Sequence, residues 1–169
     1  GDLPPVSAFS YLSAGTTSRI FLSGEETRPP FSPAHGRVYA HVLTGPEANT
    51  TWELPALGRM AWENALASPY SQLKTIVVGM DDADRLTDPN QTPSPSELYI
   101  YIGTKKKKGG NEIWRAGLVD GFLYGARVSV NGVKVTQESN SLGFGSTSFV
   151  GSGRFDLYNN QGPYESGYG

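Results

Sequence analysis

The sequence predicts an all-β fold built from short antiparallel strands. Charged residues make up 18% of the chain, which is low against the usual quarter for soluble domains. The 21 glycines and 12 prolines divide the chain into short segments, and apolar runs rich in β-branched and aromatic residues recur between them. The 169 residues suit one domain with a real core. A sandwich, a barrel or a set of propeller blades fits this pattern.

Residues 1–18 are polar, contain Pro4-Pro5 and form a lead-in that holds a short strand near residues 9–12. The first full strands are expected at residues 19–23, 37–43 and 51–54. The second of these alternates well between its two faces, and a Gly45-Pro46 turn leads from it to the third. We therefore expect antiparallel neighbours.

The stretch 57–69 has the most helical character, because Ala61, Ala65 and Leu66 share one face of a helix. Gly58 and Pro69 restrict it to one or two turns around residues 62–67. No helix longer than about ten residues is expected.

Strands are expected again at residues 75–79, 97–102, 122–130, 133–136 and 147–150. The dipeptide Asn131-Gly132 is a strong hairpin signal between two of them. The expected division of the chain is a lead-in at 1–18, a β domain with propeller-like blades at 19–150 and a Gly/Tyr-rich tail at 151–169.

Several function classes are disfavoured. A net charge of −2 argues against general nucleic-acid binding, and no apolar run approaches the roughly 20 residues of a membrane-spanning helix. The absence of cysteine excludes disulfides and thiolate ligands. No G-x-S-x-G motif or P-loop occurs. The only histidines are His35 and His41, so no hydrolytic triad is predicted and catalytic residues stay unassigned.

The run Lys105–Lys108 has two interpretations. It is either an anion-binding patch or a solvated hairpin tip. We favour the hairpin tip, because adjacent lysines repel one another and are better solvated than clustered.

Acidic residues follow or flank three apolar segments that are far apart in the sequence. Glu25-Glu26 come after one strand, Glu63 stands beside Trp62, and Asp81-Asp82 end another strand. Acids at successive strand ends can converge, and carboxylates are ligands of hard cations such as calcium. We expect Glu25, Glu63 and Asp81 to lie near one another. The alternative is that these groups are simply solvated at turns.

These segments occur in an order that resembles a known family. The motifs S-G-E-E, L-G-R-x-x-W-E-N, an apolar strand ending in D-D, and E-L-Y-I-Y-I-G are similar to those of PhoX-type alkaline phosphatases, also described as domain of unknown function 839. The resemblance covers residues 19–127. It implies a secreted bacterial β-propeller with calcium and iron in a central site.

The resemblance also implies a set of metal ligands. The candidates are Glu25, Glu26, Glu63, Asp81 and Asp82. Asn64 offers a further oxygen. Two positions depart from the family pattern: Gly24 replaces the cysteine that ligates iron, and Trp62 replaces a histidine. Calcium is therefore the expected cofactor, and iron is doubtful because soft thiolate is missing.

Three functions remain open. The first is a metal-dependent phosphoester hydrolase in which Arg19, Arg59 or Lys74 stabilises developing charge. The second is a calcium-stabilised, non-catalytic module for binding. The third is an assembly protein whose strand edges pair between copies. A blade takes about 40–45 residues, so the chain supplies roughly three or four blades and is expected to belong to a longer chain or to associate with itself. The expected location is secreted, periplasmic or at the cell surface.

Overall fold

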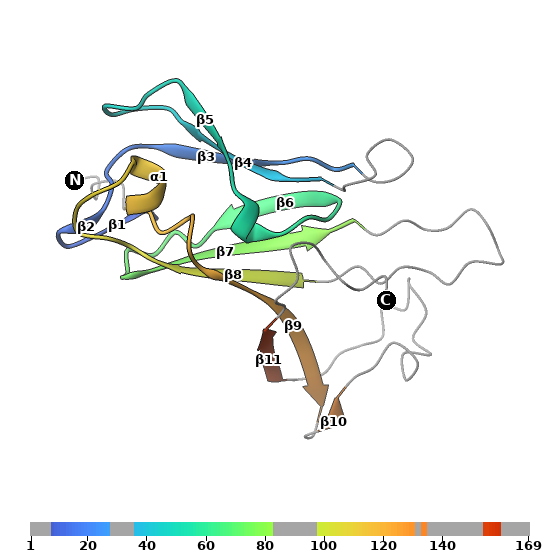
Figure 1. Ribbon diagram of the computed structural model, residues 1–169. Coiled ribbons are helices and arrows are strands. Elements are labelled where there is room, and N and C mark those ends of the chain that lie inside the picture. The colour runs from blue at the N-terminus through green and yellow to red at the C-terminus, as the bar shows by residue number, and fades with distance from the viewer. Residues whose placement is uncertain (1–7, 28–35, 83–97, 131–132, 135–153, 160–169) are drawn as a thin grey trace, which may run out of the picture.

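The computed structural model describes residues 8–27, 36–82, 98–130, 133–134 and 154–159, and they form an almost entirely antiparallel β structure (Figure 1). The all-β prediction is confirmed. Within these ranges the helical pieces are a 3-10 turn, η1 (Pro55–Leu57), and one short helix, α1 (Glu112–Arg115). No helix in the described ranges is long and apolar enough to cross a membrane.

The first half of the chain forms a hairpin and a three-stranded sheet. The hairpin pairs β1 (Ser10–Tyr11) with β2 (Ala14–Gly15), so the lead-in contains two very short strands. The sheet follows the order β3 (Ile20–Gly24), β4 (Val38–Val42) and β5 (Thr50–Glu53). In β4, Val38, Ala40 and Val42 are buried and the residues between them are not. This period of two directs one face of the sheet to the core, as expected from the sequence.

The second sheet follows the order β10-β9-β8-β7-β6, and β11 pairs with β9. Its strands are β6 (Trp62–Ala67), β7 (Lys74–Asp81), β8 (Leu98–Thr104), β9 (Phe122–Val130), β10 (Val133–Lys134) and β11 (Arg154–Asn159). The pairing of β9 with β10 confirms the predicted hairpin. β11 falls within the expected tail and is hydrogen-bonded to β9. The strand expected at 147–150 lies outside the described residues.

One hydrophobic core joins the two sheets. It combines Val38, Ala40 and Val42 of β4 with Val77 of β7 and Tyr99 and Tyr101 of β8. The connections around the sheets close it with Leu54, Leu57, Ile113 and Leu118. In Figure 1 the β3-β4-β5 sheet lies over β6, β7 and β8. The stacking buries the apolar face of each sheet, which is the dominant stabilising contribution.

The helical turns predicted around residues 62–67 are wrong. This segment is strand β6, which pairs with β7 through Ala65↔Gly79 and Leu66↔Val78. Alanine has the highest intrinsic helix propensity, but intrinsic propensity is a small energy that tertiary packing overrides. Here the large Trp62 side chain is 2% exposed, and strand pairing satisfies the backbone of the segment.

Trp62 lies between the two sheets. A Cβ atom added to Gly24 of β3 would overlap the Trp62 side chain, and one added to Gly79 of β7 would overlap its ring. Both positions therefore need glycine so that the indole can approach the backbone closely. The two glycines make room for one tryptophan that links the sheets.

The hairpin-tip interpretation of the lysine run is wrong for its first member. Lys105 is 3% exposed, and its Nζ donates to the carbonyl oxygens of Gln72 (2.7 Å) and Lys74 (2.9 Å). Lys106 is partly buried and forms an ion pair with Asp120 at 2.8 Å. Only the last two lysines of the run are exposed. Burying a lysine is tolerated here because carbonyl oxygens replace water.

Candidate metal centre

Three carboxylates from separate segments meet at one place. Glu26, Glu63 and Asp82 each contribute an oxygen atom, and these atoms lie within 4.8 Å of one another. Glu26 lies two residues beyond the end of β3, Glu63 is the second residue of β6, and Asp82 directly follows β7. The three acidic segments that the sequence singled out therefore meet through Glu26, Glu63 and Asp82. We call these residues the carboxylate cluster.

Backbone hydrogen bonds hold the three segments together. The Trp62 amide donates to the Glu25 carbonyl (3.1 Å), and the Asp82 amide donates to the Ala61 carbonyl (2.8 Å). The register between β6 and β7 shifts between Trp62 and Asn64, which leaves Glu63 as the extra residue of a β-bulge. Bulges re-aim side chains and are frequent beside functional sites. The extra residue of the bulge is therefore the one whose carboxylate joins the cluster.

Glu25 and Asp81, which were expected to converge with Glu63, bond elsewhere. The Glu25 carboxylate accepts from the Arg37 amide (3.0 Å) and from the Tyr39 hydroxyl (3.5 Å). The Asp81 carboxylate accepts from the Ala61 amide at 3.1 Å and is buried. Neighbouring residues of an extended chain face opposite sides. In each acidic pair, one carboxylate thus binds the protein backbone and the next one joins the cluster.

The chemistry of the cluster favours a hard cation. Glu26 and Glu63 are exposed, whereas Asp82 is half-buried. Calcium takes six to eight oxygen ligands from carboxylates, carbonyls and water. Asn64, which the sequence offered as a further oxygen donor, directly follows Glu63 in β6.

An iron centre of the type that the resemblance implies does not fit these residues. Gly24 has no side chain, and a cysteine there would need a Cβ atom in space that Trp62 occupies. The two departures from the family pattern are therefore in contact with each other. Without thiolate or histidine, the donor set is all oxygen, which suits calcium, magnesium or manganese rather than a thiolate-bound iron.

Two of the three cationic candidates, Lys74 and Arg19, lie away from the carboxylate cluster. Lys74 begins β7 and Asp82 follows the end of that strand, so at about 3.3 Å per residue they are about 26 Å apart. The Lys74 ammonium donates to the Thr104 hydroxyl (2.8 Å). Arg19 directly precedes β3, so it lies at the opposite end of that strand from Glu26. Its backbone amide donates to the Thr44 hydroxyl. Arg59 lies between η1 and β6, at intermediate exposure.

A hydrogen-bonded chain across β3, β4 and β5 was missed in the sequence. His41 bonds to the Ser23 hydroxyl through Nε2 (2.8 Å) and to the Thr51 hydroxyl through Nδ1 (2.9 Å). The Phe21 ring stacks on His41 with 5.9 Å between centroids. These residues are cross-strand partners or their diagonal neighbours. Only the strand register brings them together, so no local motif could have revealed them.

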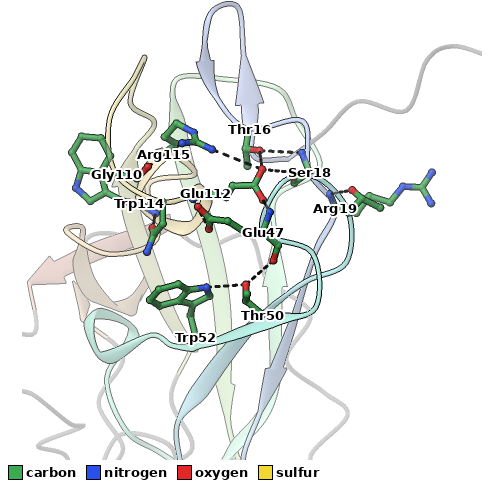
Figure 2. Close-up of polar contacts among 12 residues, drawn as sticks. Thr16, Ser18, Arg19, Glu47, Thr50, Trp52, Gly110, Glu112, Trp114 and Arg115 are labelled. Carbon is green, nitrogen blue, oxygen red and sulfur yellow. Dashed lines mark hydrogen bonds and ion pairs between the residues drawn. The ribbon is translucent and has the colours of Figure 1, made fainter.

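A second missed feature is the buried carboxylate of Glu112 at the start of α1 (Figure 2). It accepts hydrogen bonds from the hydroxyls of Thr16 (3.0 Å) and Ser18 and from the Glu47 amide (3.3 Å). Arg115 lies 3.8 Å away. The backbone amide of Glu112 donates to the Glu47 carboxylate at 3.0 Å. Glu112 is thus a structural hub joining three distant segments.

Comparisons with known proteins return nothing: no family model, no curated protein and no solved structure matches the chain.

Proposed function

We propose that the protein binds a divalent cation of the calcium class at Glu26, Glu63 and Asp82. The observation that carries the proposal is the convergence of three carboxylate oxygens within 4.8 Å from segments far apart in the sequence. The β-bulge at Glu63 supports it, because the irregular residue of the strand is the one that joins the cluster. Bound between three segments, the cation would act as a cross-link of the fold.

The wider proposal is a calcium-stabilised β-module of a secreted or cell-surface protein, related to the PhoX-type family. The order of its acidic motifs supports this, as does the antiparallel path β6-β7-β8-β9, because a propeller blade is a four-stranded antiparallel sheet. Phosphoester hydrolysis would need a cation that polarises the phosphoryl group and a further positive charge at the site. Two of the three cationic candidates, Lys74 and Arg19, lie at the far ends of β7 and β3 from the cluster, so binding is the function proposed.

A thermal melt with calcium and with chelator tests the proposal. A ligand that binds only the folded state at 100 times its Kd stabilises it by about 2.7 kcal/mol. We expect calcium to raise the Tm of the wild-type protein and calorimetric titration to show one site. Glu63→Gln and Asp82→Asn should remove the calcium-dependent rise. Melts of the same variants without calcium measure any loss of stability that does not depend on the cation.

The matched control is Glu53→Gln, which removes an exposed carboxylate that pairs with Arg37. This variant should keep the full response to calcium. A melt that is indifferent to calcium, or an equal loss of response in all three variants, would contradict the proposal. Elemental analysis should show no stoichiometric iron, and turnover of a phosphoester by the calcium-loaded protein would extend the function from binding to hydrolysis.

A further inference from the structure

Three chain reversals form one end of the molecule. They are the β1–β2 hairpin, the β6–β7 turn and the lysine-rich segment after β8, and they lie together in Figure 1 around the labels β1, β2 and α1. Hydrogen bonds join them. The Ser71 hydroxyl donates to the Ser10 carbonyl (2.7 Å), and the Gly15 amide donates to the Lys106 carbonyl (2.9 Å). The three tips are therefore held as one surface.

This surface exposes large apolar side chains. Leu12 is 90% exposed, Tyr70 75%, Leu73 46% and Tyr11 36%. Single exposed apolar residues are common, but a group of them at one place marks an interaction site. Leu12 also has φ of 51°, a left-handed conformation that a branched side chain adopts at a cost. Glycine or asparagine would adopt this turn conformation at a lower energy cost than leucine. The turn geometry alone therefore does not explain why leucine occupies this position.

The charge of the same surface is positive. The described residues of the three reversals, 8–18, 68–74 and 105–110, contain no aspartate or glutamate. Lys107 and Lys108 are exposed, whereas Lys106 is paired with Asp120 (2.8 Å) and lies over the Trp114 ring (5.5 Å). The carboxylate cluster is remote, because Asp82 follows the opposite end of β7. The exposed lysines therefore lie away from the carboxylate cluster.

We propose that this end docks on the surface of an anionic lipid bilayer. We name it the docking end, consisting of Tyr11, Leu12, Tyr70, Leu73, Lys107 and Lys108. Leu12 and the tyrosines would enter the boundary between headgroups and acyl chains, where amphipathic tyrosine rings are favoured. The two lysines would meet anionic headgroups. A protein partner fits less well, because lysine is depleted in protein interfaces.

Co-sedimentation with vesicles tests this inference. Vesicles of phosphatidylcholine alone are compared with vesicles that contain phosphatidylserine, all in chelator. The chelator prevents calcium from bridging the carboxylate cluster to phosphatidylserine. We expect binding to the anionic vesicles only, and weaker binding as salt is raised, since screening removes the electrostatic part.

Two pairs of variants locate the binding surface. Leu12→Ser should weaken vesicle binding roughly tenfold, whereas Leu66→Ser, which alters a 55% exposed residue of β6, should not. Lys108→Gln should weaken it about fivefold, whereas Arg59→Gln should have no such effect. An unchanged melting curve for each variant confirms that the fold is retained.

Other results would overturn the inference. These are the absence of binding to phosphatidylserine vesicles, or equal losses in Leu12→Ser and Leu66→Ser. Concentration-dependent self-association that Leu12→Ser removes, without vesicle binding, would identify a second copy as the occupant. The inference does not depend on the cation site: a protein indifferent to calcium can still bind vesicles, and the reverse also holds.

Discussion

At the scale of single residues, Lys105 shows how burial changes an ordinary lysine. Its ammonium donates to two backbone carbonyls, yet burial lowers its pKa to about 8. The unfolded chain retains the ordinary value near 10.5. Below pH 8, Lys105 is protonated in both the folded and the unfolded chain. The folded state then carries the full free-energy cost of burying the charged ammonium. Between pH 8 and 10.5 the unfolded chain binds more protons, so stability rises with pH in that window.

This sign can be measured by comparing the wild type with Lys105→Met. The free energy of unfolding of the wild type, relative to the variant, should increase by on the order of 1 kcal/mol between pH 7.5 and 9.5. The pH range ends at 9.5 because of Tyr101, whose pKa is raised by burial. Above pH 10 this tyrosine ionises in the unfolded chain but not in the folded one, so stability falls as pH rises. Urea titrations at several pH values provide the measurement. Lys107→Met, at an exposed position, is the control, and an identical pH dependence for both variants would contradict the explanation.

At the scale of elements, α1 is a helix of only four residues that owes its place to side-chain bonds. Asn111 caps it by accepting from the Trp114 amide at 2.8 Å, a typical N-cap interaction. Glu112 then joins it to Thr16 and Ser18 before β3 and to Glu47 in the β4–β5 turn (Figure 2). A helix this short is not stable alone, so tertiary bonds hold it.

We expect Glu112→Ala to lower the free energy of unfolding by about 3 kcal/mol, because it leaves buried donors without acceptors. Glu112→Gln keeps one carbonyl oxygen for the hydroxyls and should cost about half as much. Equilibrium urea unfolding measures both. Glu53→Ala, which removes an exposed ion pair with Arg37, should cost less than about 1 kcal/mol. Equal losses for Glu112→Ala and Glu53→Ala would show that the hub contributes little.

At the scale of the whole molecule, Trp62 couples the two sheets. Its side chain lies against Gly24 of the first sheet and Gly79 of the second, and its amide bonds to Glu25. Its indole Nε1 is buried without a hydrogen-bond partner among the described residues. Packing therefore accounts for its contribution, and the unpaired N–H reduces it.

Trp62→Ala should lower the free energy of unfolding by about 3–5 kcal/mol and separate the unfolding of the sheets. Circular dichroism and the fluorescence of Trp52 and Trp114 should give coincident transitions in the wild type and distinct ones in the variant. Trp62→Phe keeps a ring and removes the unpaired N–H, so its loss should be much smaller. Leu66→Ala, at an exposed position of the same strand, is the control. Coincident transitions in Trp62→Ala would refute the coupling.

The sequence by itself determined the fold class and most strands. Alternation of apolar residues, as in β4, and turn chemistry, as at Asn131-Gly132, act over a few residues and can be read locally. It also identified the acidic segments that converge. Which carboxylate of each pair joins the cluster depended on the strand pairing and on the bulge at Glu63.

Only the tertiary structure decided the features that depend on distant neighbours. Residues 62–67 read as helical turns but form a strand, because Trp62 packs against glycines from both sheets. Lys105 reads as a hairpin tip but is buried, because carbonyls of the β6–β7 turn replace its water. Glu112 and the chain Ser23–His41–Thr51 carry no local signal. Burial and strand register are set by segments far apart along the chain, so the physical cause of each feature lies outside its own stretch of sequence.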